Sequence, residues 1–263
     1  MRPARVGAVS YLNTRPLVHG LDARPDLFTV RFDVPAVCAR LLHDGAVDLG
    51  LVPAIEFLRG DYAVVPDVAI ASDGPVWSVA IFTRQPMTRV RTIALDTSSR
   101  TSVALTRILC ARLWAIEPAF TPAAPDIEAM LAEHDAALVI GDPALVIDAD
   151  RLGVEKVDLG EAWRTLTGLP FVYAMWTGRP GAIDGEQVAA LQSARDRGLA
   201  DVERLAGEAA QSRPALGPLA LSYLRDTLKY GLGERELAGV ARFHAMAVEL
   251  GLAPATRPLR CFS

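Results

Sequence analysis

Residues 92–114 read TIALDTSSRTSVALTRILCARLW. The apolar run 92–95 predicts a short buried strand, and the polar run after it leads into a helix that extends to about Trp114. A strand that passes directly into a helix is one half of a βαβ unit. The stretch therefore predicts an α/β fold built on a largely parallel sheet.

The alternation of strand and helix continues on both sides of this stretch. Upstream, apolar runs predict strands at 5–9 and 28–32, and Pro35 occupies the first position of a helix that ends near Gly45. Further strands are expected at 47–52, 62–71, 76–83, 136–140, 154–159 and 169–176. From Asp184 onward, apolar residues recur at helical spacing, which predicts a helical C-terminal part.

Length and composition limit the classes of protein and partner. The chain has 263 residues, which is enough for one large domain or two modest ones. Its hydrophobic fraction of 51% can fill more than one core. A net charge of −4 argues against a nucleic-acid or membrane partner, because both are bound by basic surfaces. A small anionic ligand is compatible with this charge, since hydrogen-bond donors inside a cleft matter more for binding than the net charge of the whole chain.

Signals for export, membrane insertion and bound cofactors are not found in the sequence. The N-terminus lacks the apolar core of a signal peptide, and no run approaches the ~20 apolar residues that span a bilayer. The three cysteines form no CxxC pair, and the four histidines lack metal-site spacing. No glycine-rich nucleotide-binding motif occurs. We therefore expect a cytoplasmic protein that uses neither a metal nor a nucleotide cofactor.

Three polar segments each follow a predicted strand, where ligands bind in open α/β sheets. The first segment is SYLNTRP at 10–16, and its first residue, Ser10, is a candidate substrate-binding residue. Asn13 and Thr14 are both residues that cap helices well. Alternatively, Asn13 projects into a cleft, where its amide can donate to a carboxylate or accept from a hydroxyl. The sequence leaves both interpretations open.

The second segment is DTSSRTS at 96–102, at the start of the predicted helix. Successive hydroxyls and backbone N–H groups at a helix start can hold an anion, and an arginine can add a positive charge. The alternative is an ordinary N-cap, but a cap needs only one such residue. We therefore favour an anion site. The candidate residues are Thr97, Ser98, Ser99, Arg100 and Thr101.

The third segment is GDPA at 141–144, which follows the strand expected at 136–140. Pro143 is typical of a first helical position, so the simplest interpretation of Asp142 is a helix cap. A position lining the ligand cleft is the alternative, and Asp142 is the only acidic residue well placed for it. We therefore include Asp142 among the candidate substrate-binding residues.

Several motifs occur in a familiar order along the chain. They are VSYLNTRPL, DGAVDLGLVPAIEF, ASDGPVWSVAIF, ALDTSSRTSVAL, IGDPAL and DLGEAWRTLTGLPFVYAMW. Together they extend from Val6 to about Trp176 and resemble the chorismate dehydratase family of the futalosine route to menaquinone. The tail SYLRDTLKYGLGERELAGVARFHAMA is similar to the C-terminal helices of that family. Each motif is weak by itself, but their shared order is specific.

The resemblance implies a two-lobed α/β fold like that of type II periplasmic binding proteins, with a ligand cleft between the lobes. Lobe one is then discontinuous and comprises residues 1–86 plus 169–263, and lobe two comprises 87–168. The implied reaction removes water from chorismate to give 3-[(1-carboxyvinyl)oxy]benzoate. Asn13 and Ser78 would be the catalytic residues, and the hydroxyl run at 97–101 would hold an anion. The family is thought to use the substrate's own enolpyruvyl carboxylate as the base.

Two other functions are compatible with this fold. One is a binding protein for a small anionic solute, although the chain lacks the export signal that a transport receptor needs. The other is 1,4-dihydroxy-6-naphthoate synthase, a related enzyme of the same pathway. That family opens with a motif like SPCPNDT and is expected to use a histidine of the second lobe. Here the only histidine in that region, His134, precedes a predicted strand.

Overall fold

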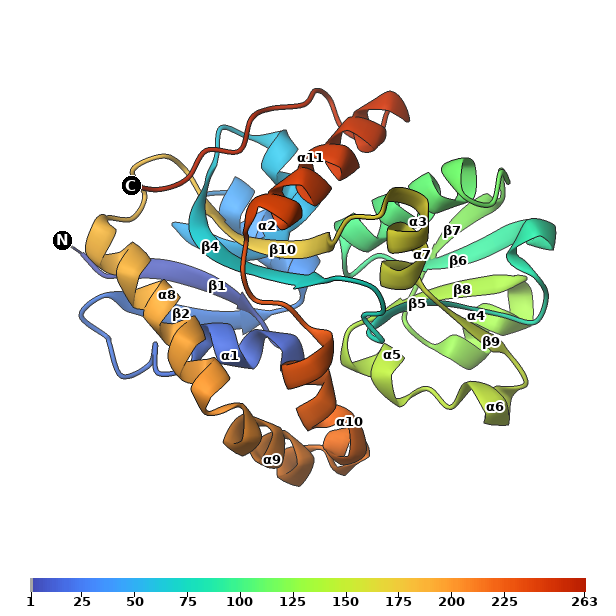
Figure 1. The fold of residues 1–263 in the computed structure, drawn as a ribbon, viewed down its shortest axis with the longest axis horizontal. Coiled ribbons are helices and arrows are strands. Elements are labelled where there is room, and N and C mark those ends of the chain that lie inside the picture. Colours follow the sequence, from blue (N-terminus) through green and yellow to red (C-terminus); the bar gives the residue numbers. More distant parts are fainter. Residues whose placement is uncertain (1) are drawn as a thin grey trace.

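Two five-stranded sheets, one in each of two lobes, form the frame of the molecule (Figure 1). The computed structural model describes residues 2–263. The first sheet has the order β2-β1-β3-β10-β4 and the second β7-β6-β8-β5-β9. The strands of the first sheet are β1 (Ala4–Val9), β2 (Phe28–Asp33), β3 (Leu49–Pro53), β4 (Ala63–Ser72) and β10 (Phe171–Gly178). Those of the second are β5 (Val79–Thr83), β6 (Thr92–Asp96), β7 (Ala119–Ala123), β8 (Ala136–Ile140) and β9 (Glu155–Asp158).

Both sheets share one topology, in which the fourth strand is antiparallel to its neighbours. β1 pairs in parallel with β2 and β3, and β6 does the same with β7 and β8. The fourth strand of each sheet, β10 or β5, runs antiparallel to both its neighbours. β5 precedes the rest of its sheet, whereas β10 returns to the first sheet after β9. The chain therefore passes between the lobes twice, and the predicted two-lobed α/β fold is confirmed.

The first passage between the lobes comes earlier than the predicted boundary at Pro86. β4 ends at Ser72 in the first sheet, and β5 begins at Val79 in the second. The apolar run 76–83 reveals a strand but not the sheet in which it pairs, which is why the boundary was misplaced. The second passage lies between Asp158 and Phe171, the interval that contains the predicted boundary at Leu169. We propose these two passages as the lobe limits.

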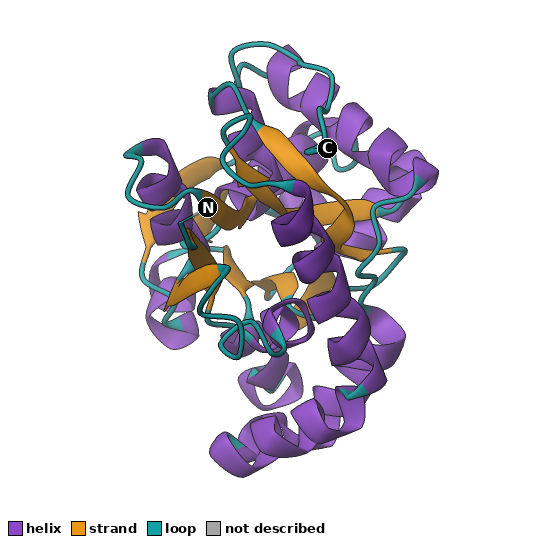
Figure 2. Cartoon of the chain, turned by 90° about the vertical axis from the view of Figure 1, so that its left-hand side faces the viewer, coloured by secondary structure: helices purple, strands orange, loops and turns teal. Residues whose placement is uncertain are grey.

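Helices cover the sheets of both lobes, and Figure 2 shows how they surround the strands of the first. Those of the first lobe include α1 (Arg15–Val18), α2 (Pro35–His43), α8 (Gly185–Ala200), α9 (Val202–Ser212), α10 (Gly217–Ser222) and α11 (Glu234–Glu249). The second lobe contains α3 (Arg100–Arg112), α4 (Ile127–Glu133), α5 (Asp142–Val146) and α6 (Ala149–Leu152), and α7 (Leu159–Thr167) leads back to β10. Pro35 begins α2 as predicted, and an Asp184–Gln187 capping box begins α8.

Strand β7 is an element that the sequence did not predict. Its side chains are mostly exposed, and Pro122 lies within it, so it has neither an apolar run nor a clear alternation. It is one of the two edge strands of the second sheet and pairs with β6. A proline is tolerated at such an edge because its missing N–H faces away from the ladder.

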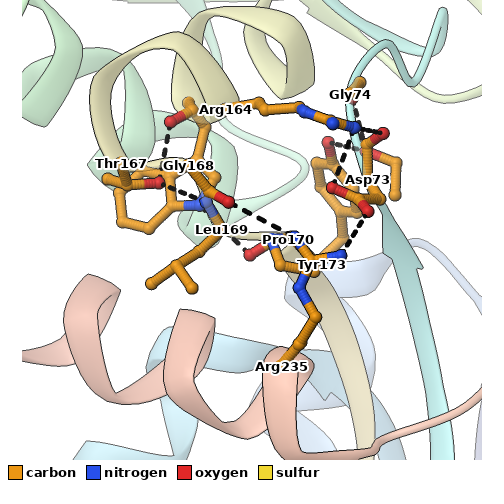
Figure 3. Close-up of polar contacts among 11 residues, drawn as sticks. Asp73, Gly74, Arg164, Thr167, Gly168, Leu169, Pro170, Tyr173 and Arg235 are labelled. Atoms are coloured by element: carbon orange, nitrogen blue, oxygen red, sulfur yellow. Dashed lines mark hydrogen bonds and ion pairs between the residues drawn. The ribbon is translucent and has the colours of Figure 1, made fainter.

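Polar contacts tie the two passages between the lobes to each other (Figure 3). Arg164 on α7 donates to the Asp73 carbonyl at 2.7 Å and pairs with the Asp73 carboxylate at 3.0 Å. Arg235 on α11 pairs with the same carboxylate at 2.8 Å and donates to the Gly168 carbonyl at 3.3 Å. Beside them, the buried Trp163 side chain donates to the Pro170 carbonyl at 3.1 Å. These contacts therefore join both connecting segments into one region, the hinge between the lobes.

Membrane and metal features can be checked over residues 2–263. None of the helices there combines the length and the hydropathy needed to cross a bilayer. Within the same residues, no group of three or more histidine, cysteine, aspartate or glutamate side chains is arranged to hold a metal ion.

Candidate active site

A small cavity of about 50 Å³ lies between the two lobes. Its lining from the first lobe is Val9, Tyr11, Asn13, Pro35, Pro53, Ile70, Tyr173 and Ala174, and from the second Val76, Ser78, Val79, Ser99, Ser102, Ile140 and Gly141. All the polar side chains in this set are hydroxyls, except for the amide of Asn13. Among the described residues, no charged side chain and no histidine lines the cavity. The site is therefore a neutral hydrogen-bonding enclosure.

Asn13 lies on a short 3-10 turn, Leu12–Thr14, that directly follows β1. Neither this turn nor helix α1 has a side-chain cap, although Thr14 occupies the N-cap position of α1. The Asn13 amide oxygen accepts a long hydrogen bond from the Thr14 hydroxyl at 3.4 Å. Of the two interpretations of this segment, the helix cap is thus wrong, and Asn13 faces the cavity.

Ser78 lies just before β5, where the chain enters the second lobe, and is almost fully buried. The preceding residue, Trp77, has a φ of +64°, which non-glycine residues rarely adopt. Asp158 stabilises this turn, because its carboxylate accepts from the backbone N–H groups of Val76 at 3.0 Å and Trp77 at 2.6 Å. The Ser78 carbonyl in turn accepts from the Gly141 N–H at 2.7 Å. Ser78 is therefore held from both sides.

Residues of the hydroxyl run point in different directions. Ser99 lines the cavity and caps helix α3, where its hydroxyl accepts from the Ser102 N–H at 3.4 Å. Ser102, which follows the predicted run, also lines the cavity. The Ser98 hydroxyl donates to Asp96 at 2.6 Å. Thr97 is exposed.

The remaining two members of the run contact the first lobe outside the cavity. The Thr101 hydroxyl accepts from the Ile55 N–H at 3.1 Å, and Arg100 pairs with the buried Glu56 at 3.0 Å. These placements correct the expectation that residues 97–101 all face the cleft. On a helix start, consecutive side chains point around the axis, so only those on one side can reach the same ligand.

The positions of Ser10 and Asp142 also differ from those expected of substrate-binding residues, because neither side chain lines the interlobe cavity. Ser10 lines a separate pocket of about 470 Å³ in the first lobe, next to α1. The Asp142 carboxylate accepts from the Leu12 N–H at 2.9 and 3.1 Å and pairs with Arg213. Asp142 therefore connects the lobes, while its neighbour Gly141 lines the cavity. A side chain on Gly141 would clash, because its Cβ would lie 2.6 Å from the Tyr11 ring.

Three tyrosines around the cavity were missed by the sequence reasoning. Tyr11 lies across the lobe boundary, with its hydroxyl 3.4 Å from that of Ser98. The Tyr173 hydroxyl on β10 is 3.0 Å from that of Ser72, and the Tyr223 hydroxyl donates to Ser78 at 2.7 Å. Burial raises the pKa of all three, most strongly at Tyr173 and Tyr223. They therefore stay protonated and remain neutral near pH 7.

Comparison with solved structures assigns the fold to a class. Protein AF1704 from Archaeoglobus fulgidus matches with a TM-score of 0.75 at 17% identity, covering 95% of this chain and 98% of that one. The periplasmic aliphatic sulphonate binding protein SsuA from Escherichia coli matches with a TM-score of 0.66 at 16% identity, covering 100% and 94%. The two lobes with a cavity between them thus define a protein with the fold of the periplasmic binding proteins.

Sequence comparison assigns the family. Residues 4–249 match the profile of a family described as menaquinone biosynthesis. A chorismate dehydratase from Thermus thermophilus is 34% identical over 98% of this chain and 100% of its own length. The chain belongs to this menaquinone biosynthesis family, together with that chorismate dehydratase. The resemblance inferred from the sequence motifs is therefore confirmed.

Proposed function

We propose that this protein is a chorismate dehydratase, a carbon–oxygen lyase that removes water from chorismate to give 3-[(1-carboxyvinyl)oxy]benzoate. Membership of the family and the 34% sequence identity with the Thermus thermophilus enzyme support this reaction. The observation that carries the mechanism is the lining of the interlobe cavity: among residues 2–263, its polar side chains are hydroxyls and one amide, with no carboxylate, histidine or cationic side chain. We further propose that the reaction takes place in the cytoplasm, as part of menaquinone biosynthesis by the futalosine route.

Loss of water from chorismate breaks two bonds. The C–H bond at the carbon bearing the enolpyruvyl ether breaks, and its electron pair enters the ring, where the diene and ring carboxylate take up developing charge. The neighbouring C–O bond breaks, and hydroxide leaves with its electron pair. The proton and the hydroxide combine as water, and the ring becomes aromatic. The protein therefore has to position a dianion, accommodate moving charge and align the leaving hydroxyl.

No side chain of the lining can accept a proton readily near pH 7, which supports the enolpyruvyl carboxylate of the substrate as the base. Asn13 and Ser78 are the proposed catalytic residues. Asn13 would donate to the substrate and orient it, and the Ser78 hydroxyl would hold a carboxylate or the leaving hydroxyl. Ser99 and Ser102, with the free N–H groups at the start of α3, would hold the other anionic group.

The size of the cavity implies movement of the lobes. Pockets for small molecules usually have volumes of about 300–1,000 Å³, whereas this one has about 50 Å³. Contacts such as the Tyr11–Ser98 approach close it from both lobes. We propose that the lobes open around the hinge to admit chorismate and close again for the reaction, which keeps bulk water away from the reacting atoms.

The experiment is to incubate the purified protein with chorismate and to follow the aromatic product by chromatography. Formation of 3-[(1-carboxyvinyl)oxy]benzoate, unaffected by EDTA, is the expected result. Tight binding of chorismate without any product would instead favour a solute-binding protein. Loss of activity in EDTA that a divalent metal restores would overturn the cofactor-free mechanism.

The related 1,4-dihydroxy-6-naphthoate synthase is the weaker alternative. Its expected histidine would have to come from the second lobe, and His134 lies at the end of α4, where its Nδ1 contacts the Met130 carbonyl at 3.1 Å. It does not line the interlobe cavity. His134→Gln is therefore expected to keep activity on chorismate, whereas a loss of activity would favour a catalytic histidine.

A further inference from the structure

Tyr223 links the C-terminal part of the chain to the proposed catalytic residues. It begins a single π-helical turn, Tyr223–Thr227, that follows α10, and it is fully buried. Such turns are rare and occur frequently at functional sites, because the wider turn redirects a side chain. Here the Tyr223 hydroxyl meets the Ser78 hydroxyl at 2.7 Å, across 145 positions of sequence.

The direction of this hydrogen bond determines what Ser78 can do. Tyr223 is the donor, so the Ser78 oxygen is the acceptor. A serine hydroxyl has only one proton, which therefore stays available for an acceptor in the cavity. In the absence of the Tyr223 donor, the Ser78 hydroxyl could rotate between several orientations.

Ser78 lines the interlobe cavity together with Asn13. The Tyr223 hydroxyl keeps its proton near pH 7, because burial raises the pKa of this group. The phenol therefore remains a donor to Ser78, and the Ser78 hydroxyl proton remains available to an acceptor in the cavity.

We propose that Tyr223 is a positioning residue, whose buried hydroxyl fixes Ser78 as a hydrogen-bond donor toward the substrate. This role rests on the proposed dehydratase function of the cavity. The negative charge that leaves with the hydroxyl, or that rests on a carboxylate, would be met by a donor already oriented before the reaction. Tyr223 itself does not line the cavity.

Tyr230 provides a matched control for removal of a buried phenolic oxygen. It lies seven residues further along the chain and is also buried, but its hydroxyl has no hydrogen-bond partner in residues 2–263. Tyr230→Phe is therefore expected to retain the activity of the unmodified protein. If the role of Tyr223 were purely structural, Tyr223→Phe and Tyr230→Phe would have similar kcat values.

The test compares Tyr223→Phe, Ser78→Ala and the double variant in steady-state kinetics with chorismate. Tyr223→Phe is expected to lower kcat by about 10- to 100-fold with little change in KM, because oriented donation matters most in the transition state. The double variant is expected to match Ser78→Ala within about threefold, since Tyr223 acts through Ser78. Equal kcat values for Tyr223→Phe and Tyr230→Phe, or fully additive losses in the double variant, would overturn the proposal.

A crystal structure of the Tyr223→Phe protein separates this proposal from the dehydratase function. Ser78 is expected to change side-chain orientation when the phenol oxygen is removed. An unchanged Ser78 orientation would overturn the positioning role, whether or not chorismate is converted. If the unmodified protein converts no chorismate but Ser78 reorients in the variant, the dehydratase function fails while the positioning of Ser78 stands.

Discussion

Both carboxylate oxygens of Asp142, in the second lobe, accept a hydrogen bond from the Leu12 N–H of the first lobe, Oδ1 at 2.9 Å and Oδ2 at 3.1 Å. Asp142 is largely buried and also pairs with Arg213 of the first lobe. Leu12 is adjacent to Asn13, so the same contact holds the 3-10 turn that carries the proposed catalytic amide. One carboxylate thus joins the second lobe to the turn of the first lobe that contains Asn13.

Asp142→Ala is expected to weaken the affinity for chorismate by about tenfold or more, since hydrogen bonds to charged groups contribute roughly 1.5–3 kcal/mol each. Loss of the contact makes the closed form less populated, and the apparent affinity falls with that population. Titration calorimetry measures the affinity, and small-angle scattering measures the opening. Asp126→Ala is the control, because Asp126 caps α4 away from the cavity. Equal affinities of the two variants would contradict a role in closure.

Asn13→Asp is expected to give a folded protein with severely reduced turnover. The structure has no cap at this position to preserve, so the change acts on the cavity alone. A carboxylate loses the amide donor and adds negative charge beside a dianion, and like charges ~4 Å apart repel by roughly 4 kcal/mol at an effective dielectric of ~20. Thermal unfolding and steady-state kinetics are the measurements.

Gln211→Glu is the matched control for Asn13→Asp. It makes the same amide-to-carboxylate change on the exposed side of α9, and we expect normal kinetics. Normal kinetics for Asn13→Asp as well would remove Asn13 from the proposed site.

Ser99→Ala is expected to weaken binding of chorismate and to lower the melting temperature slightly. Ser99 both lines the cavity and caps α3, and loss of a cap costs about 1 kcal/mol. For a chain of this size that corresponds to roughly 2–4 °C. Thr97→Ala, at an exposed position two residues earlier, should change neither quantity. If binding is the same in both variants, the Ser99 hydroxyl serves only as a cap.

Stability is expected to fall on acidification below about pH 6.5 because of His244. This side chain is buried, contacts the Ala54 carbonyl through Nε2 at 3.0 Å and stacks on Phe57. Burial lowers the pKa of His244 below its ordinary 6.5. The unfolded chain therefore binds this proton at a higher pH than the folded chain, and stability is lost as the pH falls toward the folded-state pKa.

His244→Gln tests this origin, because glutamine retains a donor for the Ala54 carbonyl but does not titrate. Melting temperatures measured from about pH 7.5 to 5 should decline less steeply in the variant. Asp48 titrates in a separate range, because its hydrogen bond with Arg5 lowers the pKa of its carboxyl to about 2. The contribution of Asp48 to stability is lost only when the pH falls below 3.8, the ordinary pKa of an aspartate. Parallel declines of both proteins would exclude His244 as the cause.

Sequence reasoning alone determined the α/β fold class, most strands and three residues of the cavity. Apolar runs such as 92–95 and 136–140 predict buried strands because the apolar character that drives burial is contained in the local sequence. Asn13 and Ser99 belong to polar segments that follow predicted strands, Ser78 was implied by the family resemblance, and all three line the cavity. Strand β7 escaped prediction because an exposed edge strand carries no such pattern.

Only the tertiary structure decided how the parts meet. The sheet to which β5 belongs, the split of the hydroxyl run between the cavity and the first lobe, and the Asp142–Leu12 contact all depend on partners distant in sequence. Tyr223 is the clearest case, since nothing in the surrounding helical tail distinguishes it until Ser78 lies 2.7 Å away. Local sequence sets backbone conformation and burial, whereas a side chain acquires its hydrogen-bond partner only when the chain closes on itself in space.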